Sequence, residues 1–286
     1  MSDDEMAKRV TATERNRHFP QQHSYSARDN LHTIPLPVDN GRIRFGGVGD
    51  MHLNSRLCNE KGIEKYFHIA QDMGTSNLFS PGDQIDGLFI YPEQHLHLQR
   101  TSITEQVEYA AQFLDYVLHE GSRIFVINGN HELGGRRGVY QCYGIDPCDM
   151  LERRLPAKIT YLHNELGGNM YASARVNPNL TVDMVHTKKY VGNQPGSTTE
   201  TLLKGMILGY TPEDRPELLL VNHTHRHGHT DWQGCHAYLC GGFENPNNYS
   251  SRQNQGAEQG SYVFTVFVDE KPISISQRWI SVKRGI

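Results

Sequence analysis

The chain has 286 residues, a formal net charge of −4 at pH 7 and 37% hydrophobic residues. This composition excludes a fibrous or wholly disordered protein, and the length suits one large core or two modest ones. The slightly acidic balance gives no overall attraction to nucleic acid or to an anionic membrane, so binding to either needs a local basic patch. No apolar run is long enough to span a bilayer and the polar N-terminal stretch lacks a signal-peptide core, so we expect a soluble, cytoplasmic protein with no membrane partner.

The five cysteines are odd in number and no two have the CxxC spacing. This pattern predicts neither a disulfide framework nor a zinc ribbon, and we expect reduced thiols. The cysteines are Cys58, Cys142, Cys148, Cys235 and Cys240.

The N-terminal stretch differs from the rest of the chain. Residues 1–41 are polar, contain scattered prolines and lack a sustained apolar period, so we expect a flexible or loosely docked arm followed by a single domain over residues 42–286. Apolar residues alternate over 43–48 and predict a strand. That strand leads directly into Asp50 and His52.

Two more predicted strands end in polar residues in the same way. The short apolar run 78–80 leads to Asp83 and Asp86, and the run 123–127 leads into Asn128-Gly129-Asn130-His131-Glu132. Asn-Gly is also a common hairpin signal, so this pentapeptide alone favours an ordinary turn.

The second half of the chain adds two strand ends that carry histidines. Residues 170–176 and 180–185 predict a hairpin that ends at His186, and the apolar run 217–221 is followed by His223 and His225. Later in the chain we expect a loop over 244–260 and a hairpin formed by 262–268 and 273–280. Apolar residues at helical spacing, with capping residues before them, predict helices after Asn59, Ser102 and Ser197, and a further helix is expected over Asp146–Arg154, ended by Pro156.

Five predicted strands therefore end in side chains that can bind a metal. Open α/β sheets place their ligands beyond the carboxyl ends of the strands, so we expect these side chains to meet at one rim. Each one taken singly is more often an ordinary loop residue. The set offers only oxygen and nitrogen atoms, which suit Mn²⁺, Zn²⁺, Fe or Co, and it comprises Asp50, His52, Asp83, Asn130, His186, His223 and His225.

Seven ligands are too many for one tetrahedral ion but suit two ions that share a carboxylate, roughly 3.5–4 Å apart as in two-metal hydrolases. Two divalent ions and two aspartates leave a net positive cluster, which attracts a phosphate. The positive charge of the two ions also lowers the pKa of a metal-bound water toward about 7, so that hydroxide is available as the nucleophile. No serine or cysteine nucleophile is then required.

Five motifs follow one another along the chain: GD-x-H at Asp50, GD-x-x-D at Asp83, GNHE at Asn130, a lone His186 and HTH at His223. Together, in this order, they resemble the motifs of the calcineurin-like metallophosphoesterase superfamily. The resemblance implies an α/β fold, a four-layer α/β/β/α sandwich with two mixed sheets flanked by helices. One position departs from the family pattern, because Asn222 stands where glycine is usual. Asparagine also adopts left-handed backbone conformations, so we expect the substitution to be tolerated.

The resemblance also implies a role for each site residue. Asp50, His52, Asp83 and His225 would hold one ion, while Asp83, Asn130, His186 and His223 would hold the other. His131 resembles the histidine that contacts a phosphate oxygen and protonates the leaving group, and Asp86 resembles the carboxylate that orients Asp83. We interpret His227, His229, His95 and His97 as loop histidines outside the ligand set.

The sequence thus predicts a phosphoesterase with two divalent ions, Mn²⁺ first, that hydrolyses phosphodiesters through a metal-bridging hydroxide and resembles the SbcD-like nuclease branch. Nucleic acid is then a candidate substrate, and Arg136 and Arg137 in a glycine-rich loop are candidates for a phosphate contact. The alternatives are a phosphomonoesterase acting on a phosphoprotein or small metabolite, and a non-catalytic binding scaffold of the same fold. The oligomeric state does not follow from the sequence.

Overall fold

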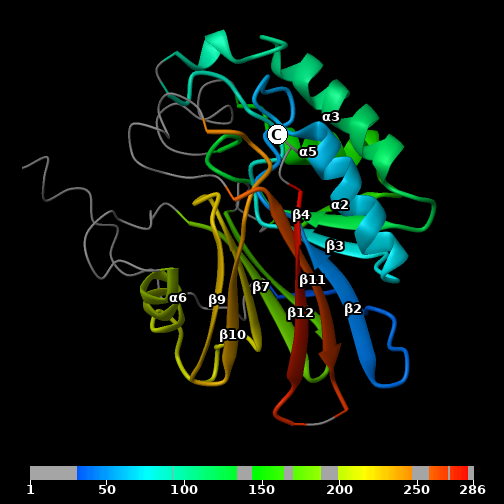
Figure 1. Ribbon diagram of the computed structural model, residues 1–286, viewed down its shortest axis with the longest axis vertical. Coiled ribbons are helices and arrows are strands. Elements are labelled where there is room, and N and C mark those ends of the chain that lie inside the picture. The colour runs from blue at the N-terminus through cyan, green and yellow to red at the C-terminus, as the bar shows by residue number, and fades with distance from the viewer. Residues whose placement is uncertain are drawn as a thin grey trace, which may run out of the picture.

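The computed structural model describes residues 31–91, 93–133, 144–163, 170–187, 199–246, 258–269 and 271–282. These residues form two mixed sheets that face each other, with helices on both outer sides (Figure 1). The first sheet has the strand order β12 (Ser274–Ser281), β11 (Gly260–Phe267), β2 (Arg42–Gly47), β3 (Asn77–Ser80), β4 (Arg123–Val126) and β5 (Ile159–Tyr161). The second sheet has the order β1 (Leu31–Thr33), β6 (Tyr171–Asn177), β7 (Leu180–His186), β8 (Leu218–Asn222), β10 (Cys235–Cys240) and β9 (His227–Trp232).

The helices divide between the two outer faces. On the first sheet, α2 (Glu60–Asp72) packs on β11, α5 (Pro147–Arg154) packs on β5, and α3 (Ile103–Val117) packs against both helices. On the second sheet, α6 (Thr199–Ile207) packs on β9 and β10. The short 3-10 helix η1 (Gln94–Leu96) lies in the loop that follows β3.

Capping explains where two of these helices begin. The Asn59 side chain accepts a hydrogen bond from Gly62 N at the start of α2, as expected from the sequence. Asp146 accepts from Cys148 N and Asp149 N at the start of α5. Ser102 does precede α3, but its side chain makes no capping hydrogen bond, so the predicted capping box is wrong.

Three hydrophobic clusters separate four layers, which confirms the predicted α/β/β/α sandwich. One cluster lies between the first sheet and its helices, one lies between the two sheets, and one lies between the second sheet and α6. A strand that lies between two hydrophobic clusters needs a continuous apolar run, as strand β8 shows. Leu218 and Leu220 face the other sheet, whereas Leu219 and Val221 face α6, so the strand is buried on both sides.

The boundary expected for the N-terminal arm is wrong at its C-terminal end. Leu31–Thr33 form β1, which pairs in parallel with β6, and the next residues continue the contact through Ile34 N and Leu36 N. The edge of β6 offers unpaired backbone groups, and a three-residue extended segment is enough to bond them. Residues 1–30 lie outside the described residues.

Two further expectations can be compared with the structure. The described cysteines, Cys58, Cys148, Cys235 and Cys240, are free and lie buried, and Cys142 lies outside the described residues. Among the described helices, none combines the length and the hydropathy needed to cross a membrane.

Candidate metal centre

The predicted ligands lie at one rim where the two sheets meet. Strands β2, β3 and β4 are parallel neighbours in the first sheet, and β7, β8 and β10 are parallel neighbours in the second. Their carboxyl ends are tied together across the sandwich, because the Asn222 side chain donates to Val48 O at 3.1 Å and His223 N donates to Asp50 Oδ2 at 2.9 Å. Both sheets therefore hold the same cluster.

One group of side chains gathers around Asp50. The ligand atoms of Asp50, His52 and His225 all lie within 4.8 Å of one another. His225 Nε2 is 3.5 Å from Asp50 Oδ2, and His52 Nε2 is 3.1 Å from His225 Nε2. Asp83 Oδ2 lies 3.7 Å from His52 Nε2. This group contains the four residues predicted to hold the first ion.

A second group lies on the other side of Asp83. The ligand atoms of Asp83, His186 and His223 also lie within 4.8 Å of one another. His186 Nε2 is 3.2 Å from Asp83 Oδ2 and 2.9 Å from Asn130 Oδ1. These are the four residues predicted for the second ion, and Asp83 belongs to both groups.

The chemistry of the donor set fits divalent cations. Nitrogen and oxygen lone pairs crowd together in a buried place, and Asp50 Oδ1 has no hydrogen-bond partner among the described residues although it is buried. Burial raises the pKa of Asp50 to about 7, because the carboxylate loses water and lies near the charge of Asp83. A bound cation would stabilise these charged groups. The identity and the number of ions stay predictions.

The backbone is strained where the ligands are. Nine non-glycine residues of the described chain have a positive φ, and four of them are predicted ligands: His52 at 48°, Asp83 at 53°, His223 at 99° and His225 at 50°. Such conformations cost on the order of 1–3 kcal/mol each and gather at functional sites. The fold thus places these four side chains in spite of a local backbone preference against it.

Asparagine at position 222 proves compatible with the site for a different reason from the one expected. The left-handed residues are His223 and His225, and Asn222 is the last residue of β8. Its amide bonds the first sheet through Val48 O, as described above. The prediction that Asn222 supplies a left-handed conformation is therefore wrong.

Glu132 has a role that the sequence did not reveal. Its carboxylate is fully buried and accepts backbone hydrogen bonds from Asp83 N at 3.2 Å, Ile85 N at 3.0 Å and Gly129 N at 2.8 Å. It therefore locks the loop after β3 to the loop after β4. Gly129 allows this close approach, because a Cβ there would lie 2.0 Å from Asp83 Oδ1. The only sequence signal for Glu132 was its place in the GNHE motif.

His131 and Asp86 lie beside the shared carboxylate. His131 N donates to Asp83 Oδ1 at 2.9 Å, and His131 Nδ1 lies 2.6 Å from the Asp86 carbonyl oxygen. The Asp86 carboxylate lies 3.3 Å from His52 Nδ1 and 3.4 Å from His131 Nδ1. Asp86 thus lies beside two imidazoles, and its predicted role in orienting Asp83 stays a prediction. The Asp83 backbone N–H is held by Glu132, and the Asp83 carboxylate accepts from His131 N.

Glu244 is a further buried carboxylate that sequence reasoning missed. It follows β10, accepts a hydrogen bond from Ser55 Oγ at 3.0 Å, and lies within 4.8 Å of ligand atoms of His52 and Asp86. Asp86 lies at Nδ1 of His52, on the side of the ring away from His225, which lies at Nε2. No sequence pattern marked Glu244, because long-range pairing brings its loop to the rim: β10 pairs with β8, Gly242 pairs with Asp50, and Glu244 pairs with Cys58.

The remaining predicted residues lie elsewhere. Arg136 and Arg137 fall outside the described residues. His227 and His229 belong to strand β9 and not to a loop, where His227 stacks on Trp279 and His229 stacks on Tyr238. His95 lies exposed in η1, apart from both ligand groups.

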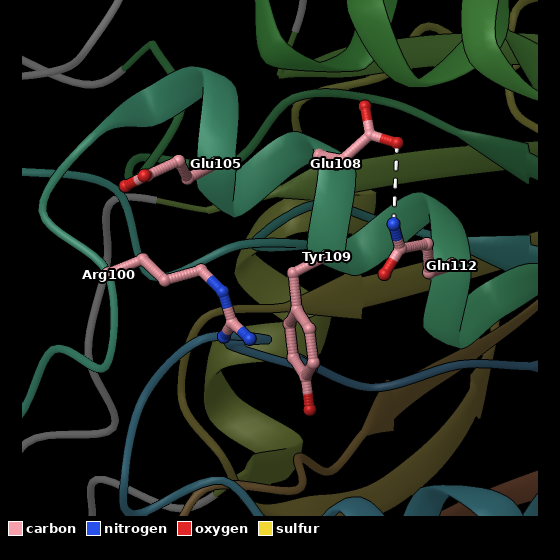
Figure 2. A pocket seen from close by; sticks show the side chains of 5 residues that line it. All are labelled: Arg100, Glu105, Glu108, Tyr109 and Gln112. Carbon is pink, nitrogen blue, oxygen red and sulfur yellow. Dashed lines mark hydrogen bonds between the residues drawn. The ribbon is translucent and has the colours of Figure 1, made fainter.

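A separate pocket on the outer face of α3 lacks the features of a metal centre. Figure 2 shows its lining residues, Arg100, Glu105, Glu108, Tyr109 and Gln112. The Arg100 guanidinium lies 3.8 Å from the centre of the Tyr109 ring, and Tyr109 Oη donates to Glu60 Oε1 at 2.6 Å. These groups stabilise one another on the surface, so we assign the chemistry to the rim.

No model of a protein family matches the chain, and no curated protein matches it. Similar solved structures include an archaeal phosphodiesterase (12% identity, 83% of this chain and 100% of that chain, TM-score 0.41). They also include vacuolar protein sorting 29 from Cryptosporidium parvum (9% identity, 83% of this chain and 97% of that chain, TM-score 0.40). A further one is a predicted phosphoesterase from Streptococcus pneumoniae (10% identity, 83% of this chain and 98% of that chain, TM-score 0.37). At these values we base neither the fold nor the function on them.

We expect metal binding to release protons. Burial lowers the pKa of His186, but the charges of Asp83 and Asp50 outweigh this effect and raise it to about 9, and the pKa of His52 is likewise raised. Both rings are thus protonated at pH 7 without metal, yet only neutral imidazole binds a metal. Calorimetric titration with Mn²⁺ in buffers of different ionisation enthalpy should show about two protons released at pH 7. The metal affinity should fall toward pH 5, and a proton count of zero would contradict the assignment.

Glu132→Gln should loosen the centre. A glutamine amide cannot accept at both ends, so at least one of the three backbone N–H groups loses its partner and the protein loses about 1–3 kcal/mol of stability. Urea denaturation of the metal-free protein checks the stability, and calorimetry checks Mn²⁺ affinity, which should fall about 10–100-fold. The matched control Glu105→Gln, on the exposed surface of α3, should change neither quantity measurably.

Proposed function

We propose that this protein is a metal-dependent phosphoesterase that holds two divalent ions and hydrolyses phosphodiester bonds. One observation supports this proposal most strongly: two groups of nitrogen and oxygen ligands share the buried carboxylate of Asp83, with His131 directly beside it. Two adjacent ions of this kind are the usual device for in-line displacement at phosphorus. When bound, they would offset the charge of the phosphate and lower the pKa of a water molecule toward about 7.

The chain's own residues would position the ions and move the proton. His131 Nδ1 donates to the Asp86 carbonyl, which fixes the ring and leaves Nε2 for the substrate. Burial lowers the pKa of His131, but the charges of Asp83 and Asp86 outweigh this effect and raise it above its ordinary value. A protonated imidazole held in this way is suited to protonate the departing oxygen.

The preference for a phosphodiester follows from the motif resemblance. The same centre can serve a phosphomonoesterase, so relative rates with bis-p-nitrophenyl phosphate and p-nitrophenyl phosphate discriminate between the two activities. The nuclease prediction is tested with single-stranded DNA and RNA in Mn²⁺, then in Zn²⁺, Fe²⁺ and Co²⁺. The complete ligand groups and His131 argue against the non-catalytic scaffold, which predicts no turnover with any substrate and any of these metals.

Asp83→Asn should abolish turnover and reduce the bound metal toward one ion. The amide keeps the size of the carboxylate but removes the charge that both groups share. Metal content measured by elemental analysis after dialysis, together with bis-p-nitrophenyl phosphate hydrolysis, checks both effects. Two ions retained with full activity would overturn the shared-ligand assignment.

His131→Ala should keep both ions and lose about 10²–10⁴-fold in rate, because it removes a proton donor and no ligand of either group. The loss should be larger for a substrate with a poor alkoxide leaving group than for p-nitrophenyl esters, which depart without a proton. His68→Ala, half exposed on α2, is the control and should leave the rate unchanged. Loss of both ions in His131→Ala would contradict its role.

A further inference from the structure

The start of the loop after β3 lies against His131. We refer to residues 86–91 as the rim segment. The Asp86 carbonyl bonds the His131 ring, and a Cβ on Gly87 would be 2.4 Å from His131 O. At the other end of the segment, the Tyr91 ring centre is 6.2 Å from the His131 ring centre. The rim segment therefore passes beside the group that would protonate the leaving oxygen.

Two buried glutamines fix the rim segment in place. Gln106, fully buried in α3, bonds Gly87 N through Oε1 and Gly87 O through Nε2, both at 3.0 Å. Gln94 is also buried and bonds Asp86 O at 2.6 Å and Ile90 N at 2.8 Å. A segment held by four such hydrogen bonds presents its side chains in a defined position.

Phe89 stands out within this fixed segment. Its side chain is 59% exposed, which makes it one of few large apolar side chains in solvent among the described residues, and its φ is 58°. A single exposed apolar residue is ordinary by itself. A bulky residue held both exposed and left-handed, in a segment that passes beside His131, is not, because such strain persists only where surrounding bonds impose it and gathers at functional sites.

We propose that the Phe89 ring is a stacking surface for a nucleobase, so that the substrates of this centre are nucleoside phosphate esters. This inference rests on the proposed phosphoesterase function, since the phosphate must lie at the metal centre for its organic group to reach the rim segment. Aromatic stacking on a base has no counterpart for a phosphorylated protein side chain such as serine. Because Phe89 offers a flat ring and no hydrogen-bonding group, it should accept all bases and favour purines.

The test compares two ligands that differ only in the base. These are the 5′-methylene phosphonate analogues of AMP and of ribose 5-phosphate, in which carbon replaces the ester oxygen and prevents hydrolysis. Calorimetry with Mn²⁺-loaded protein should show about tenfold tighter binding of the adenosine analogue. Phe89→Ala should reduce that ratio to about one without changing the affinity for the ribose analogue, and Phe89→Trp should restore it.

Further variants keep the result interpretable. Phe89→Asn removes the ring while suiting the left-handed backbone, so it should behave like Phe89→Ala even if alanine disturbs the segment. Leu208→Ala, 63% exposed beside α6, should keep the tenfold ratio. Equal affinities in the unmodified protein, or equal weakening of both ligands by Phe89→Asn, would overturn the stacking surface and leave the phosphoesterase standing. Failure of both analogues to bind, together with no hydrolysis of bis-p-nitrophenyl phosphate, would overturn both proposals.

Discussion

The bonds that Glu132 makes with the loops after β3 and β4 place the Asp83 carboxylate between two sets of imidazoles. Asp83 must adopt a left-handed backbone to reach this place, and its Oδ1 would collide with any side chain at position 129. Neither condition is favourable locally. Both are met because a buried carboxylate that accepts three backbone hydrogen bonds allows essentially one relative position of the two loops.

The layers of the sandwich stabilise that position. Strands β3, β7 and β8 each contribute side chains to two of the three hydrophobic clusters, so their carboxyl ends cannot shift without disturbing two cores. The strain at His52, His223 and His225 is thus offset by packing that extends through the whole molecule. Rigid strands with strained residues immediately after them combine a stable fold with a defined ligand geometry.

The ligands could be predicted from the sequence because each follows an apolar run, and parallel strands with two buried faces have this appearance. The contacts between residues of different loops at the rim could not be predicted from the sequence. The distance from Asp86 to His52 and His131, and the position of Glu244, depend on how loops from different strands fold over one another, which no local spacing encodes. The strands β1 and β9 were missed for another reason. They lie at sheet edges, where three residues or a histidine-rich polar stretch suffice to pair.

The missed carboxylates change the charge expected at the centre. Two divalent ions and the aspartates Asp50 and Asp83 leave an excess of two positive charges, which Asp86 and Glu244 would cancel if both were ionised. Burial acts to raise the pKa of Asp86, but bonding to His131 and His52 outweighs it and lowers the pKa to about 2, so Asp86 stays charged. Burial raises the pKa of Glu244, and also that of Glu132 to about 7. The raised pKa of Glu244 favours its neutral form and so favours a positive excess at the centre. Asp86 lies on the Nδ1 side of His52, whereas the Nε2 side of that ring faces His225 and Asp83, so the charge of Asp86 lies on the side of the ring away from the predicted ions.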